Sequence, residues 1–120
     1  MAPQITREQL KAKMDRGEDF VLVEALSQKH YASSHLPGAI NLPYEFVDEA
    51  EKVLPDKRRE VVVYCMNPDC LASREEAREL EEMGYERVLH YAAGKQDWTR
   101  AGLPVEGKRH SDRQGGDRLA

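Results

Sequence analysis

Short apolar runs alternate with amphipathic segments along the chain. The two clearest runs, over 20–23 and 61–64, are rich in β-branched and aromatic residues, which is typical of strands buried on both faces of a sheet. Shorter strands are expected over 39–42 and 87–91. Helices are expected between the strands, over 7–16, 27–34, 44–54, 73–83 and 95–101. This alternation predicts one α/β domain with a mainly parallel central sheet and helices on both faces.

Local signals mark the ends of several helices. Thr6 and Gln9 have the spacing of a capping box, so the first helix is expected to begin at Arg7. Gly84 is a natural residue for the turn that ends the helix over 73–83. Five glutamates of that helix are expected to point into solvent: Glu75, Glu76, Glu79, Glu81 and Glu82.

Length and composition limit the classes of protein that fit. The 120 residues suffice for one domain with a core, expected over 1–107, and the polar tail over 108–120 is expected to be disordered. The net charge of -4 gives no reason to expect nucleic-acid or membrane binding. No apolar run approaches the roughly 20 residues of a membrane span. The N-terminus lacks a signal pattern, so a cytoplasmic location is expected.

Cys65 is the strongest candidate for chemistry. It directly follows the buried run over 61–64, and turn residues then lead into a helix that begins near Ser73. A thiol that faces a helix N-terminus is stabilised as a thiolate by the helix dipole and by free N–H groups. In parallel sheets this edge is also where ligands bind, near a switch in strand order. These residues favour a nucleophile, and the alternative is a small buried hydrophobe.

Four segments follow one another along the chain: HLPGAINLP (35–43), the buried strand with YC (64–65) before a loop and helix, LEEMGY (80–85), and GKQDW (94–98) followed by AGLPV (101–105). Together they resemble motifs of the rhodanese family of sulfurtransferases. The resemblance implies that Cys65 takes sulfane sulfur from a donor such as thiosulfate and holds it as a persulfide. Cyanide, a thiol or a sulfur-carrier protein would accept the sulfur, and no cofactor is implied.

The loop after Cys65 departs from the family's C-x-x-G-x-R-S pattern. Ser73 lies eight positions after Cys65 instead of six, and Ala72 stands where an arginine is expected. Arg74 is the nearest cation. The backbone N–H groups of the loop are expected to curl around the sulfur and bind an anion. The predicted anion-binding loop consists of Met66, Asn67, Pro68, Asp69, Cys70, Leu71, Ala72, Ser73 and Arg74.

Three further residues have proposed roles with simpler alternatives. Both cysteines are expected to be thiols, and Cys70 is a candidate resolving thiol for Cys65 or only a loop filler. No metal site is expected, because two more ligands would be needed. Structural support is expected from His35, which would fix the turn at 37–38, and from Glu24, which would accept loop N–H groups or Arg74 or cap a strand end.

Two other functions stay open on the same fold. The longer loop motivates a phosphatase or arsenate reductase, although the arginine of a C-x5-R loop would stand at position 71, which is Leu71. A non-catalytic interaction or redox-sensing module is the other alternative. A reversible disulfide between Cys65 and Cys70 would favour redox sensing.

Overall fold

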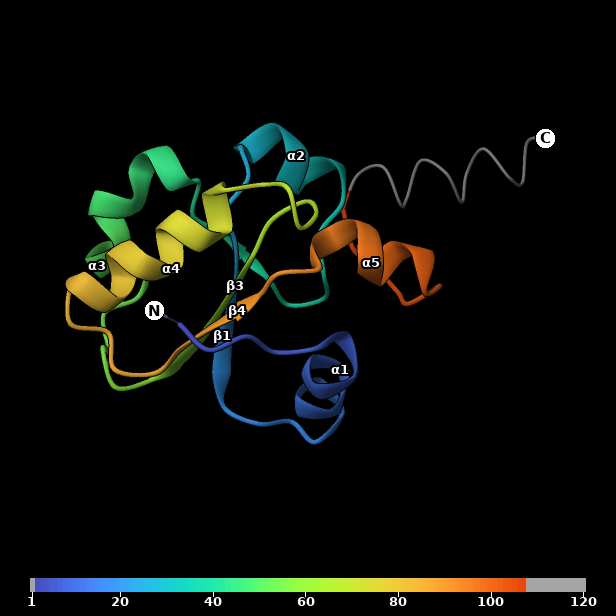
Figure 1. Ribbon diagram of the computed structural model, residues 1–120, viewed down its shortest axis with the longest axis horizontal. Coiled ribbons are helices and arrows are strands. Elements are labelled where there is room, and N and C mark those ends of the chain that lie inside the picture. Colours follow the sequence, from blue (N-terminus) through green and yellow to red (C-terminus); the bar gives the residue numbers. More distant parts are fainter. Residues whose placement is uncertain (1, 108–120) are drawn as a thin grey trace.

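A computed structural model describes residues 2–107 of the chain. Its four strands form one parallel sheet in the order β2-β1-β3-β4. Figure 1 labels β1, β3 and β4 at the centre of the domain. The strands are β1 (Phe20–Glu24), β2 (Ile40–Asn41), β3 (Glu60–Tyr64) and β4 (Val88–Tyr91). The α/β class and the parallel sheet are confirmed. The tail predicted over 108–120 lies outside the described residues.

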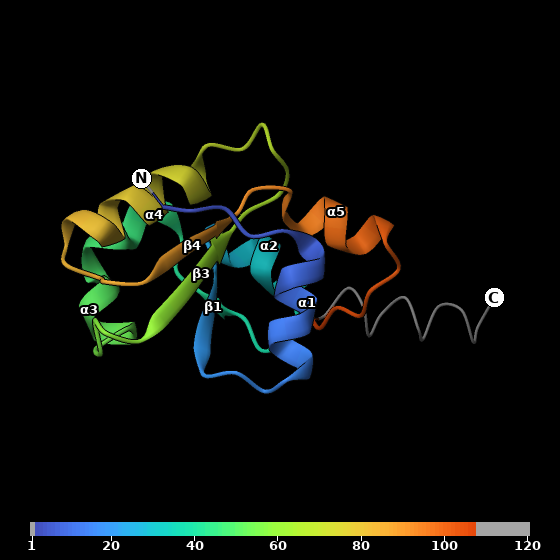
Figure 2. The ribbon, with the colours of Figure 1, turned by 60° about the horizontal axis from the view of Figure 1, so that its bottom comes forward.

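Helices cover both faces of the sheet, as expected. The helices α1 (Arg7–Asp15) and α5 (Gly94–Arg100) lie on one face, and α3 (Ala50–Val53) and α4 (Ala72–Glu82) lie on the other (Figures 1 and 2). The short helix α2 (Gln28–Ser33) follows β1. Within residues 2–107, no helix is both long enough and apolar enough to cross a membrane.

The helical segment expected over 44–54 is confirmed, but it is divided into two short helices. Tyr44–Glu49 forms the 3-10 helix η1, with a kink at Phe46, and only Ala50–Val53 is α-helical. Phe46 and Val53 are 50% and 47% exposed. The segment still packs one side into the core through Ala50 and Leu54, and the non-helical backbone angles of Phe46 are what interrupt the helix.

Side chains of β3 alternate between two cores. Val61 and Val63 pack with α3 and α4, whereas Val62 and Tyr64 pack with α1 and α5. This follows from the two-residue period of a strand. Cys65 continues the phase of Val61 and Val63, so its side chain enters the α4 side of the sheet.

Glu76 does not point into solvent as predicted. It lies three residues after Ser73 and four before Leu80, and all three side chains are buried on the same face of α4. Within residues 2–107, neither of its carboxyl oxygens has a hydrogen-bond partner. Burial raises the pKa of this carboxyl to about 9, which keeps it protonated at neutral pH.

Glu76 is expected to make the stability of the fold depend on pH. The carboxyl ionises near its usual pKa of 4.5 in the unfolded chain and at about 9 in the folded chain. The contribution of this carboxyl to the free energy of unfolding is therefore fully present below pH 4.5. It decreases as the pH rises from 4.5 towards 9. Glu76→Leu should remove the dependence and raise the free energy of unfolding by about 1–3 kcal/mol in mildly alkaline buffer.

Urea unfolding in mildly acidic and mildly alkaline buffer measures both effects. Glu82→Leu is the matched control, because Glu82 is exposed on the same helix and should shift stability by no more than about 0.5 kcal/mol. An unchanged pH dependence in Glu76→Leu would contradict the assignment.

Candidate active site

Cys65 lies directly after β3 at the switch in strand order. The connection from β1 leads to β2 and that from β3 leads to β4, on opposite sides, so the switch lies between the ends of β1 and β3. The loop after Cys65 is held by the start of α5, where the N–H groups of Lys95 and Gln96 donate to the carbonyls of Cys65 and Met66 at 2.8 and 2.9 Å.

Gly94 permits this close approach of α5 to the loop. Its φ is +78°, and an added Cβ would lie 2.7 Å from the carbonyl carbon of Met66. Any other residue would therefore be strained and would also collide with the backbone of the loop. The glycine of the GKQDW segment thus sets the position of the chain beside Cys65.

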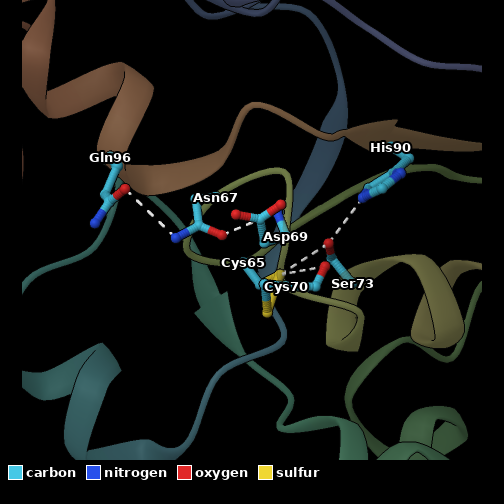
Figure 3. Close-up of a disulfide and its surroundings, with 7 residues drawn as sticks. All are labelled: Cys65, Asn67, Asp69, Cys70, Ser73, His90 and Gln96. Carbon is cyan, nitrogen blue, oxygen red and sulfur yellow. Dashed lines mark hydrogen bonds between the residues drawn. A yellow bond between two sulfur atoms is a disulfide. The ribbon is translucent and has the colours of Figure 1, made fainter.

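The two cysteines form a disulfide (Figure 3). Their Cα atoms are 6.5 Å apart, within the usual range for such a bond. The expectation of two free thiols is wrong for this state. Cys65 is 1% exposed, whereas Cys70 is half-buried and lines a cavity of about 1050 Å³ together with Arg74 and His90. Cys70, not Cys65, therefore forms the wall of the cavity.

Ser73 links Cys65 to His90 (Figure 3). The Ser73 Oγ lies 3.1 Å from the Cys65 Sγ and 2.7 Å from the His90 Nε2. Ser73 comes from the first turn of α4, and His90 comes from β4, where its backbone bonds to Pro3 and Ile5 at 2.8 and 3.0 Å. The arrangement is a short hydrogen-bonded path from the sulfur to an imidazole.

His90 was not among the predicted site residues. Burial lowers the pKa of its imidazole, and the charge of Arg74 lowers it further, so His90 is neutral near pH 7 and can accept a proton. The strand register could have pointed to it, because His90 pairs with Val63 and so shares a face of the sheet with Cys65.

Glu24 is buried at the end of β1, but its partners differ from those predicted. Its carboxylate accepts hydrogen bonds from the Tyr64 hydroxyl at 2.7 Å and the Lys95 ammonium at 3.1 Å, not from Arg74. Lys95 also donates to the carbonyls of His30 and Ser34. Desolvation lowers the pKa of Lys95, against the opposing effect of Glu24. Lys95 is thus a buried cation that was missed, and the supporting role of Glu24 stays a prediction.

His35 contacts Tyr31 and Glu106. Its Nδ1 is 2.7 Å from the carbonyl oxygen of Tyr31, and the two rings stack at 3.9 Å. Its backbone N–H donates to the Glu106 carbonyl at 2.8 Å, and the Glu106 carboxylate accepts from the N–H of Gly38 at 3.1 Å. These contacts surround the turn that His35 is predicted to support.

In the disulfide state, two N–H groups of the predicted anion-binding loop are already paired within the loop. The N–H groups of Asp69 and Cys70 donate to Asn67, at 3.0 and 3.1 Å, and Pro68 has no N–H group. The Cys70 carbonyl oxygen lies 3.5 Å from the Cys65 Sγ, a contact that does not stabilise negative charge on sulfur. The N–H groups at the start of α4, where Leu71 makes no side-chain cap, stay the candidate donors.

Among residues 2–107, no group of three His, Cys, Asp or Glu side chains could hold a metal ion. The Ser73 hydroxyl and, beyond it, the His90 imidazole are side-chain groups that lie next to the Cys65 sulfur. Arg74, the predicted nearest cation, is exposed and lies on the cavity wall with Cys70.

Comparison with known proteins shows the family. Residues 6–101 match the rhodanese-like domain, so the chain belongs to the rhodanese-like family. It is 33% identical over 98 residues to the thiosulfate sulfurtransferase GlpE of Glaesserella parasuis. The alignment covers 78% of this chain and 84% of GlpE. The solution structure of the rhodanese-like domain of Anabaena Alr3790 has a TM-score of 0.81 at 29% identity, covering 92% of this chain and 83% of that one.

Two relatives are much longer than this chain. It is 34% identical over 103 residues to the HTH-type transcriptional regulator Rv0324 of Mycobacterium tuberculosis, covering 85% of this chain. It is 26% identical over 97 residues to the putative sulfur carrier protein YrkF of Bacillus subtilis, covering 81%. The chain spans only 44% of the length of Rv0324 and 51% of that of YrkF.

The path through Ser73 is expected to control the reactivity of Cys65. In reduced protein carrying Cys70→Ser, adding Ser73→Ala or His90→Ala should slow alkylation of Cys65 by iodoacetamide at neutral pH on the order of tenfold. Ser73→Ala removes the hydrogen bond to the thiolate, and His90→Ala removes the group that accepts the thiol proton through Ser73. Ser27→Ala is the matched control, since Ser27 forms a similar pair with His30, at 2.8 Å, on the surface. Equal alkylation rates in all variants would show that the path does not act on Cys65.

Proposed function

We propose that this domain is a sulfurtransferase with Cys65 as its sulfur carrier. It takes sulfane sulfur from a thiosulfate-like or persulfide donor and passes it to a thiophilic acceptor. The observation that carries the proposal is a buried cysteine after β3, at the switch point, beside Ser73 in the first turn of α4. The likeness to GlpE, named a thiosulfate sulfurtransferase, supports the same chemistry.

Reduced Cys65 must lose its proton before it attacks the donor. The proton has a route through Ser73 to the Nε2 of neutral His90, over 3.1 and 2.7 Å. The thiolate then bonds to the outer sulfur of thiosulfate. The sulfur–sulfur bond of the donor breaks, and sulfite leaves with the bonding electron pair. The positive end of α4 stabilises both the thiolate and the persulfide anion.

The acceptor takes the outer sulfur of the persulfide and returns Cys65 to the thiolate. Cyanide and small thiols have the nucleophilicity that this step requires. A sulfur-carrier protein is a further acceptor, and the likeness to YrkF, named a putative sulfur carrier protein, supports such a partner. The steps need no cofactor, and a cytoplasmic location would supply the reduced thiols.

A redox-sensing role without turnover is the second candidate, and the disulfide favours it. The likeness to Rv0324, named a transcriptional regulator, is compatible with a sensing domain. A phosphatase or arsenate reductase lacks comparable support. The position that would need an arginine holds Leu71, whose side chain is 57% exposed.

Thiocyanate formation tests the transferase proposal. Dithiol-reduced wild type should form thiocyanate from cyanide and at least one sulfane donor, and Cys65→Ser should be reduced to background because the sulfur carrier is removed. Ser27→Ala, on the surface, serves as the control that keeps activity. If wild type and Cys65→Ser are equally inactive with thiosulfate, an aryl thiosulfonate and a small-molecule persulfide, the transferase reading is wrong and redox sensing is favoured.

A further inference from the structure

Cys70 is bonded to the sulfur that is proposed to carry the persulfide. We propose that Cys70 resolves this persulfide, so that the domain releases its sulfur as hydrosulfide and closes the Cys65–Cys70 disulfide. The domain would then be a dithiol-dependent sulfane-sulfur reductase as well as a transferase. This proposal rests on the proposed function, because it needs a persulfide on Cys65.

The step balances within the loop. The Cys70 thiolate attacks the Cys65 Sγ, and a new sulfur–sulfur bond forms between them. The bond from the Cys65 Sγ to the sulfane sulfur breaks, and that sulfur leaves with the electron pair as hydrosulfide, taking the proton that Cys70 gave up. The two cysteines together lose two electrons, and the sulfane sulfur gains two.

The loop holds Cys70 in position for this attack. A turn at Asn67 folds the loop back, since the Asn67 carbonyl accepts the Cys70 N–H at 3.1 Å and its side chain accepts the Asp69 N–H at 3.0 Å. The Asn67 amide also donates to Gln96 on α5 at 3.4 Å (Figure 3). This turn lies within the lengthened loop between Cys65 and Ser73. The loop therefore brings the sulfur of Cys70 to the sulfur of Cys65.

The surroundings of Cys70 favour its thiolate form. Cys70 lies two residues before α4, an 11-residue helix whose positive end faces the loop. Arg74 and His90 line the same cavity wall as Cys70. The imidazole of His90 is thus available to take the proton of the Cys70 thiol, and the charge of Arg74 stabilises the thiolate that forms.

The difference in exposure between the two sulfurs determines how the disulfide is reopened. Cys65 is 1% exposed, and Cys70 lines the cavity of about 1050 Å³. An external dithiol therefore attacks Cys70, and Cys65 leaves as a thiolate that can accept a hydrogen bond from Ser73, 3.1 Å away. The dithiol is oxidised to its own disulfide, and the domain returns to the form that accepts sulfur.

A single-turnover experiment tests the proposal. Reduced wild type, Cys70→Ser and Cys70→Ala are freed of reductant and mixed anaerobically with thiosulfate or an aryl thiosulfonate. Hydrosulfide, cyanide-labile sulfane sulfur and free thiols are then counted per chain. Wild type should release about one equivalent of hydrosulfide and lose both thiols to the disulfide. Both variants should keep about one equivalent of sulfane sulfur and release less than about a tenth as much hydrosulfide.

The outcomes separate the two proposals. If Cys70→Ser and Cys70→Ala load with sulfane sulfur but release hydrosulfide as fast as wild type, Cys70 is not the resolving thiol, and sulfur transfer through Cys65 still stands. If the wild-type persulfide persists while Cys70 stays a free thiol, Cys70 is likewise not the resolving thiol. If no protein gains sulfane sulfur or releases hydrosulfide, the proposed function fails and the resolving role fails with it. Circular dichroism of each variant checks that the fold is retained.

Discussion

The alternation of side chains along β3 places Cys65 beside its hydrogen-bond partners. Val61, Val63 and Cys65 enter the core under α4, and Val62 and Tyr64 enter the core under α5. This phase brings Cys65 to Ser73 on α4, and through the pairing of β3 with β4 it brings His90 to the same side. A shift of one residue in the register would exchange the cysteine with the tyrosine and separate the sulfur from both partners.

The other face of the sheet holds the frame of the site. Glu24, Tyr64 and Lys95 form a buried network that joins β1, β3 and α5. A buried charge pair is costly to desolvate, so its main effect is to fix geometry and not to add net stability. Here it fixes the start of α5, whose N–H groups bind the carbonyls of Cys65 and Met66. The loop after Cys65 is therefore positioned from the α5 face of the sheet, while the Cys65 sulfur lies on the α4 face.

The strands and the place of Cys65 could be predicted because both depend on local patterns. A buried parallel strand reads as a continuous apolar run, and the residue after it lies at the edge where ligands bind. The burial of Glu76 could not be predicted, since its helix carries glutamates on several faces and only the packing against η1 and the sheet decides which one is buried. Lys95 was missed for the same reason, whereas His90 depends on the register of β3 with β4, a weaker signal than an apolar run. Their roles come from partners that lie 71 positions away for Lys95 and 17 positions away for His90.

The disulfide changes how the lengthened loop is understood. The loop with two extra positions folds back and places Cys70 over Cys65. The central claim is that Cys65 carries sulfur. Intact-mass analysis of reduced Cys70→Ser after incubation with a sulfane donor tests it most directly, because the persulfide cannot be resolved there. A gain of one sulfur atom, reversed by cyanide and absent when Cys65→Ser is added, is predicted. An unchanged mass, or the same gain without Cys65, would contradict it.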